Sequence, residues 1–221
     1  MIEPLSGEAV RVLGVLIEKS MSTPEYYPMT LNALRNACNQ KSNRDPVVTF
    51  GETDVIAALD ELQHRKLMGH VSGGGSRAMK YRHALAEQWE MSTGQCAVLS
   101  CLFVRGAQTI GEIKGRTGRL FSFGSLSKVE ESLDSLDQRN PSLVQRVARR
   151  PGQKEARYMH LLSGADVVQE MISPTVPASE PTGLVKSTLH VEDGLRAELD
   201  ELREQIKRLR LDFESFREQF D

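Results

Sequence analysis

Two short patterns in this sequence have residue types that could act on a substrate or hold a phosphate. Ser125-Leu126-Ser127-Lys128 has the S-x-x-K spacing in which a lysine can activate a serine nucleophile. The companion K-T-G and S-D-N patterns do not occur in the sequence, and Ser125 equally suits the N-cap of a helix. The glycine-rich stretch from Ser72 to Ser76 lacks the G-K-[ST] ending of a phosphate loop. We therefore interpret the first pattern as a helix cap and the second as the tip of a hairpin.

Histidines and cysteines complete the set of residues that could bind a metal or attack a substrate. The five histidines show no H-E-x-x-H spacing, and Cys38, Cys96 and Cys101 form no C-x-x-C pair. His83 and His160 fall at equivalent ends of two predicted hairpins, which indicates a shared packing role. The sequence thus predicts a protein that is not an enzyme and has no metal site and no cofactor, with its cysteines as reduced thiols.

Recognition of a partner is the chemistry for which the sequence supplies residues. Cations that can neutralise phosphates, and amides that can meet base edges, gather between Asn39 and Pro46 and around the two predicted hairpins. The candidate nucleic-acid or partner contacts are Asn39, Lys41, Asn43, Arg44, Arg77, Lys80, Arg82, Arg146, Arg149, Arg150, Lys154 and Arg157. The alternative is that these cations only form a solvated surface. A net charge of −2 argues against binding nucleic acid through bulk charge.

These candidate residues belong to a unit that occurs twice in the chain. A shift of 74 residues places one predicted helix on another, so that Val55, Leu59, Leu62 and Arg65 fall on Val129, Leu133, Leu136 and Arg139. Two helical patterns precede each of these helices, and two short alternating runs around a polar loop follow it, as in a hairpin. Three helices and a hairpin make a winged helix. We predict a mainly α fold with small β-hairpins, of the α+β class, in which residues 1–86 and 87–172 form two tandem winged-helix domains.

The third helix of a winged helix normally enters the major groove of DNA. Here its predicted outward face carries Asp60 and Glu61 in the first domain, and Glu131 and Asp134 in the second. Carboxylates repel phosphates, and affinity for DNA depends on phosphate neutralisation. We therefore expect any DNA contact to come from the hairpins, or wings, and from the polar stretch between the second and third helices.

The composition changes after residue 172. Residues 173–190 form a proline-rich linker, and residues 191–221 follow a heptad pattern typical of a coiled coil. The predicted dimerisation residues are Leu195, Leu199, Leu202, Ile206, Leu209, Phe213, Phe216 and Phe220. Arginine fills every e position, so parallel pairing sets Glu198 against Arg203 and Asp212 against Arg217, which favours a parallel homodimer. The alternative is an amphipathic helix that folds back on its own wings.

The overall composition indicates a soluble cytoplasmic protein. The 221 residues are 39% hydrophobic and 26% charged, as in ordinary globular proteins. The N-terminus lacks the basic and then apolar order of a signal peptide. The longest uncharged run, from Met91 to Val104, is too short and too polar to span a bilayer.

One stretch resembles a known family. The run LGVLIEKSMSTPEYYPMTLNALRNACNQKSNRDPVV, from Leu13 to Val48, is similar to the YceH-like family of uncharacterised bacterial proteins, and the resemblance extends to about Ile172. It implies a tandem pair of winged-helix domains and supplies no catalytic residue. The block that matches the family hallmark is Asn32, Ala33, Leu34, Ala37, Cys38, Asn39, Gln40, Lys41, Ser42, Asn43, Arg44, Asp45 and Pro46. Its residues could serve local structure, and Lys41 and Arg44 are those expected to meet a partner.

Two functions therefore stay open on the sequence. The first is a dimeric DNA-binding regulator that contacts double-stranded DNA through its wings and polar joint. The second is a protein–protein adaptor that grips a protein partner with tandem winged helices. Both predict a homodimer without a cofactor and without a membrane segment.

Overall fold

The computed structural model describes residues 3–71, 79–149 and 155–164, all within one compact unit, Met1–Pro174. Over these residues the protein has a mixed α+β fold with seven helices and two small antiparallel sheets. The proline-rich linker and the heptad helix predicted for residues 173–221 lie outside the described residues. The same holds for three predicted contacts, Arg77, Arg150 and Lys154.

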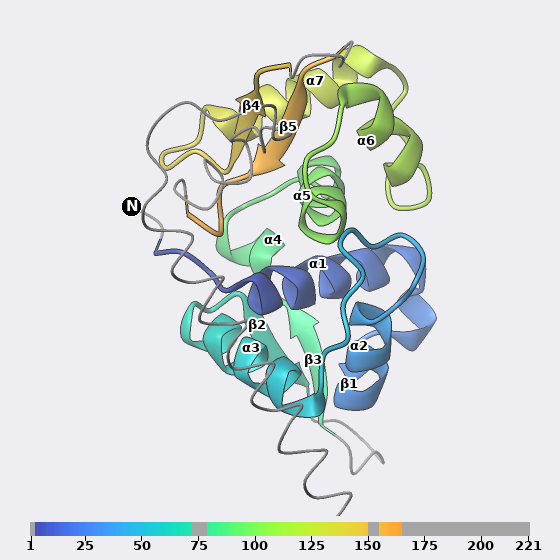
Figure 1. Ribbon diagram of the computed structural model, residues 1–221, viewed down its shortest axis with the longest axis vertical. Coiled ribbons are helices and arrows are strands. Elements are labelled where there is room, and N and C mark those ends of the chain that lie inside the picture. The colour runs from blue at the N-terminus through green and yellow to red at the C-terminus, as the bar shows by residue number, and fades with distance from the viewer. Residues whose placement is uncertain (1–2, 72–78, 150–154, 165–221) are drawn as a thin grey trace, which may run out of the picture. The chain divides into compact units, whose positions relative to one another are not determined.

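The first half of the unit combines helices with a three-stranded sheet (Figure 1). Its elements are α1 (Gly7–Ser22), the 3-10 turn η1 (Pro24–Tyr26), β1 (Met29–Thr30), α2 (Leu31–Cys38), α3 (Glu52–His64), β2 (Met68–Val71), β3 (Lys80–His83) and α4 (Leu85–Gln88). The strand order is β1-β3-β2, with Tyr81 of β3 opposite both Met29 and His70. We call residues 3–83 the first module, and α4 connects it to the second.

The second half, residues 92–164, repeats this order of elements, and we call it the second module. It contains α5 (Thr93–Arg105), α6 (Ile110–Thr117), α7 (Leu126–Asp137), β4 (Val144–Val147) and β5 (Arg157–His160). Strands β4 and β5 pair with Val144 opposite His160. A single bridge between Gln108 and Tyr158 takes the place that β1 has against β3. Three helices followed by a pair of antiparallel strands thus occur in each half, in the predicted order, while β1, η1 and α4 were not predicted.

Local side-chain chemistry explains where these helices begin. The hydroxyls of Ser6, Thr30, Ser92, Thr109 and Ser125 each accept a hydrogen bond from a backbone N–H in the first turn of a helix. Such caps satisfy amide groups that the helix itself leaves unpaired. The prediction that Ser125 caps a helix is confirmed.

Helices α1 and α5 lie side by side at the centre and join the two modules (Figure 1). Helix α1 is apolar on more than one face. Val10, Arg11 and Val15 are all buried, because α1 packs against its own module on one side and against α5 on the other. A helix buried on all sides in this way is part of a core, and one hydrophobic core runs through both modules.

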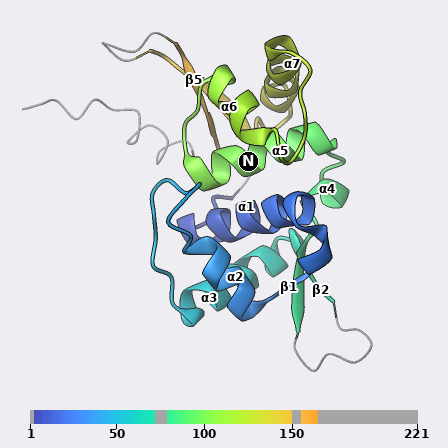
Figure 2. The ribbon, with the colours of Figure 1, turned by 90° about the vertical axis from the view of Figure 1, so that its right-hand side faces the viewer.

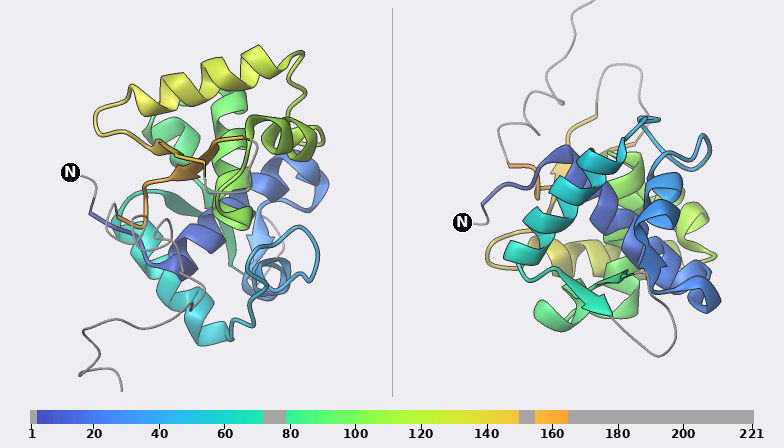
Figure 3. Two further views of the ribbon diagram at one scale, coloured as in Figure 1. Left: turned by 45° about the horizontal axis from the view of Figure 1, so that its top comes forward. Right: turned by 90° about the horizontal axis from the view of Figure 1, so that it is seen from below.

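The two third helices lie on the outside of this central pair (Figure 3). Helix α3 packs against α1, and α7 packs against α5, each through apolar residues at helical spacing. The buried positions Val55, Leu59 and Leu62 of α3 and Val129, Leu133 and Leu136 of α7 are those predicted from the repeat. Their opposite faces are exposed.

Candidate functional site

The joint, defined as residues 39–46 between α2 and α3, is held to both modules. Figure 2 shows this segment running beside α1 toward the second module. The side-chain amide of Asn39 donates to the backbone oxygen of Phe50 at 2.9 Å, and its oxygen accepts from the Phe50 N–H at 2.8 Å. The backbone N–H of Asp45 donates to the carbonyl of Val104, at the end of α5, at 2.9 Å. The joint is therefore a fixed part of the boundary between the modules.

Arg44, predicted as a partner contact, lies inside this joint. Only 6% of it is exposed, and its guanidinium forms an ion pair with Glu18 at 2.6 Å. It also donates to the carbonyl of Ala37, at 3.0 and 3.1 Å, and to the side chain of Gln40. The ion-pair partner, Glu18, comes from α1 and is 26 positions away in the sequence. We assign Arg44 to the support of the joint and leave it out of the candidate surface.

The predicted cations around the hairpins are mostly close to carboxylates. Arg82 pairs with Glu87 at 2.7 Å, and Arg157 pairs with Glu112 at 2.8 Å. Arg146 and Arg149 are exposed, but they border a hollow together with Glu130 and Glu155. Lys80 is half-buried in the three-stranded sheet, opposite Val71. The described part of the two wings is therefore less positive than the sequence suggested.

The structure instead gathers cations in a hollow between the joint and the second module. The hollow has a volume of about 810 Å³ and is bordered by α1, the joint, α5 and α6. Five cations border it: Lys19, Lys41, Arg105, Arg116 and Arg119. Among the described residues on its border, the one carboxylate is Glu18, which is already paired with Arg44. We call this space, with the five cations on its border, the cationic hollow.

The cations of the hollow influence one another. Burial, and next the neighbouring Arg116 guanidinium, lowers the pKa of Arg105. Arg105 donates a hydrogen bond to the side-chain oxygen of Asn43, a predicted contact residue with a left-handed φ of 61°. Arg116 has a carboxylate nearby, Glu112 at 3.5 Å, whereas Lys41 and Arg119 are exposed and form no ion pair within the described residues. Like charges held together in this way favour a bound anion.

Of the five cations only Lys41 was predicted from the sequence, together with its neighbour Asn43, which also borders the hollow. Arg116 and Arg119 are more than 70 positions away from Lys41, and neither falls on a hairpin or a recognisable motif. Only the packing of α1 against α5 brings α6 next to the joint. The single available signal was the basic run from Lys114 to Arg119, KGRTGR.

The outward faces of the third helices are acidic, as predicted. On α7, Glu130, Glu131, Asp134 and Asp137 are all exposed, and Lys128 there is paired with Glu131 at 2.6 Å. On α3, Asp60 is exposed, and Glu61 accepts hydrogen bonds from Ser6. A duplex placed against α7 would bring phosphates next to carboxylates.

The three cysteines, and His83 and His160, have pKa values that burial shifts away from their ordinary range. All three cysteines are buried free thiols, and burial raises the pKa of Cys38 to about 12 and of Cys96 and Cys101 to about 11. Burial lowers the pKa of both His83 and His160 to about 4. In residues 3–71, 79–149 and 155–164 no group of three metal-binding side chains occurs. Along the same residues, none of the helices combines the length and hydrophobicity needed to cross a bilayer.

Comparison with known proteins gives similarity over most of the chain. The model of a family described as protein of unknown function, DUF480, matches residues 5–153. A UPF0502 protein from Pelobacter propionicus is 44% identical over 220 residues, which cover 98% of each chain. A UPF0502 protein from Citrifermentans bemidjiense is 50% identical over 167 residues, 76% of this chain and 77% of its relative. One from Herminiimonas arsenicoxydans is 41% identical over 213 residues, 96% and 89% of the two chains.

Proposed function

Because this chain belongs to the DUF480 family of bacterial proteins, whose description names no function, we propose one from its geometry: a non-enzymatic cytoplasmic regulator that binds double-stranded DNA through phosphates at the cationic hollow. The single observation that carries the proposal is the hollow itself. Five cations, from α1, the joint, α5, α6 and the turn after α6, border one concave surface, and the one carboxylate among its described border residues is already paired. Phosphate neutralisation supplies most of the affinity of sequence-independent DNA binding.

The order of elements supports a winged-helix interpretation of each module. Three helices followed by a hairpin, with a short strand or bridge before the second helix, occur in both halves. In winged helices, elements other than the third helix often contact the DNA backbone. The acidic face of α7 disfavours major-groove reading, so we place the contact on the joint and α6.

The salt dependence of binding tests this function. The full-length protein should bind a mixed 30-base-pair duplex pool, measured by fluorescence anisotropy, and its affinity should fall steeply as salt rises. Each phosphate contact contributes a slope of about 0.9 in log K against log salt. The variant Lys41→Gln/Arg119→Gln should lower this slope by roughly 2 and weaken binding at low salt. Both side chains are exposed, so their loss should not affect folding.

A charge-matched variant provides the control. Lys66→Asn/Lys128→Gln also removes two exposed positive charges, but neither residue borders the cationic hollow. Asn is chosen at position 66 because that residue has a left-handed φ of 59°, which Asn tolerates. Equal loss of binding in both variants would show that DNA binding depends on the net charge of the protein and not on the cationic hollow. The absence of any salt-dependent binding by the wild type would end the proposal.

A second candidate function is favoured by the face of α7. Its four exposed carboxylates suit a basic protein surface, which agrees with an adaptor that binds a protein partner. The test is a pull-down from nuclease-treated bacterial lysate. Proteins that the immobilised wild type retains, and that the immobilised variant Glu131→Lys/Asp134→Lys does not retain, would support the adaptor. Retention that nuclease treatment abolishes would favour DNA.

A further inference from the structure

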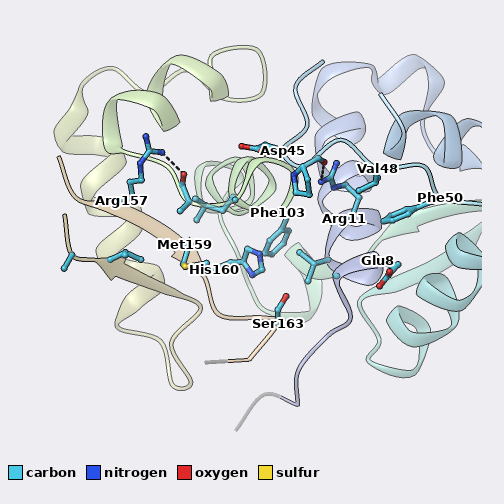
Figure 4. Close-up of a pocket in the computed structure, with 18 residues that line it drawn as sticks. Glu8, Arg11, Asp45, Val48, Phe50, Phe103, Arg157, Met159, His160 and Ser163 are labelled. Carbon is cyan, nitrogen blue, oxygen red and sulfur yellow. Dashed lines mark hydrogen bonds between the residues drawn. The ribbon is translucent and has the colours of Figure 1, made fainter. Parts of the chain in front are cut away.

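A second cavity, distinct from the cationic hollow, lies at the other end of the boundary between the modules. Its volume is about 500 Å³, within the range of small-molecule sites. The start of α1, the segment after the joint, the end of α5 and the hairpin β4–β5 all border it. Figure 4 shows side chains from both modules around it, most of them apolar, with Phe103 among them.

The cavity wall contains a buried cation, Arg11, that forms no ion pair with any described residue. Arg11 is 4% exposed, and its Nη2 donates to the carbonyl of Pro46 at 2.7 Å (Figure 4). Its Nη1 is buried and has no hydrogen-bond partner. Arg11 forms no ion pair within the described part of the chain. Burial, and next the nearby Arg44 guanidinium, lowers the pKa of Arg11, and the carboxylates of Asp45 and Glu18 offset this only in part. Leaving a buried charge unpaired is costly.

A second unsatisfied group borders the same cavity. The Nδ1 of His160 is buried without a hydrogen-bond partner, and its ring stands edge-on to Phe103 with centroids 5.1 Å apart. Burial lowers the pKa of His160 to about 4, so at neutral pH its imidazole offers a hydrogen bond and no charge. Glu8 and Asp45 also border the cavity, but both are exposed and can remain in water.

We propose that this cavity binds a small organic monocarboxylate. Its carboxylate would pair with Arg11, and its apolar body would fill the space beside Phe103. A buried guanidinium selects the negative head, because it gives a charge-assisted hydrogen bond to a group that has no such partner. The apolar wall selects the body. Since elements of both modules border the site, the bound molecule would hold them together, and its binding does not depend on the DNA proposal.

Calorimetric titration of the full-length protein tests this site with pairs of probes that differ in charge. Decanoate and naphthalene-2-carboxylate represent aliphatic and aromatic anions, and decanol and 2-naphthalenemethanol are their neutral counterparts. At least one acid should bind with one-to-one stoichiometry, at least tenfold more tightly than its alcohol, and should raise the Tm. If neither acid binds at millimolar concentration, the proposal is wrong, and the cavity holds only water. Equal binding of acid and alcohol would overturn the proposal as well.

Two variants separate the head group from the apolar body. Arg11→Met keeps a long side chain without charge and should weaken the acid at least tenfold while leaving the alcohol unchanged. Ala148→Trp, at an exposed position on the cavity border, should weaken both probes and serves as a second test if Arg11→Met folds poorly. Lys66→Asn, away from the cavity, is the control and should change neither. Acid binding that survives both Arg11→Met and Ala148→Trp would place the ligand elsewhere and refute the assignment.

Discussion

Neighbouring cations in one loop have different roles in this protein. Lys41 and Arg44 are three positions apart in the joint and look alike in the sequence. Lys41 is exposed, whereas Arg44 is buried, with only 6% of its surface exposed. The guanidinium of Arg44 connects α1 to the end of α2 through Glu18 and the Ala37 carbonyl. Arginine suits this place, because its planar group can donate several hydrogen bonds at once.

This difference predicts opposite phenotypes for the two residues. Arg44→Ala should lower the free energy of unfolding by about 3–5 kcal/mol, because it leaves the Glu18 carboxylate without its partner. Lys41→Ala should change that free energy by no more than about 0.5 kcal/mol, and should instead weaken the DNA binding that we propose. Urea unfolding measures the first effect and fluorescence anisotropy the second. A stable Arg44→Ala protein that has lost only DNA binding would contradict the structural role.

At the scale of elements, the contact between α1 and α5 decides the arrangement. Gly14 lies where the helices approach, and a Cβ added there would stand 2.6 Å from Cβ of Phe103. The buried hydroxyl of Ser100 donates to the Gly14 carbonyl at 2.9 Å across the same contact. The close approach of the backbones requires the absence of a side chain at this position.

Substitution of Gly14 should therefore destabilise the protein although it improves helix propensity. Overpacking costs about 1–3 kcal/mol, against a gain of about 1 kcal/mol from replacing glycine within a helix. Because the added Cβ meets the Cβ of Phe103, which cannot move without its backbone, the upper part of the overpacking range applies, about 2–3 kcal/mol. We therefore expect Gly14→Ala to lower the free energy of unfolding by a net amount of roughly 1–2 kcal/mol, measured by urea unfolding. The control is Gly7→Ala in the same helix, where an added Cβ meets no atom within 4 Å. An unchanged or increased stability of Gly14→Ala would show that the two helices can separate at little cost.

For the whole molecule, the open prediction concerns association. The heptad pattern of residues 191–221 predicts a parallel homodimer, and it lies outside the described residues. Removing residues 173–221 should give a monomer that keeps the helix content of the compact unit. The seam variant Leu202→Glu/Leu209→Glu, at full length, should also be monomeric if the heptad pairs two chains. Sedimentation equilibrium gives the mass of each, and a truncated protein that remains dimeric would place the interface within residues 1–172.

The sequence alone determined the local features of this protein. The start of α7 followed from the cap at Ser125, the buried positions of α3 and α7 followed from helical spacing, and the paired strands followed from alternation around polar loops. Caps, periodicity and turns depend on residues that are close together along the chain, so they can be predicted from the sequence. The acidic faces of the third helices were predicted for the same reason.

Only the tertiary structure decided which distant residues meet. The burial of Arg44, the gathering of Lys41 with Arg116 and Arg119, and the unpaired Arg11 all depend on the packing of α1 against α5. Long-range packing is set by the complementary shapes of apolar surfaces and is not encoded in any short spacing. The electrostatic surroundings of a charge, and hence its role, are therefore decided by the fold.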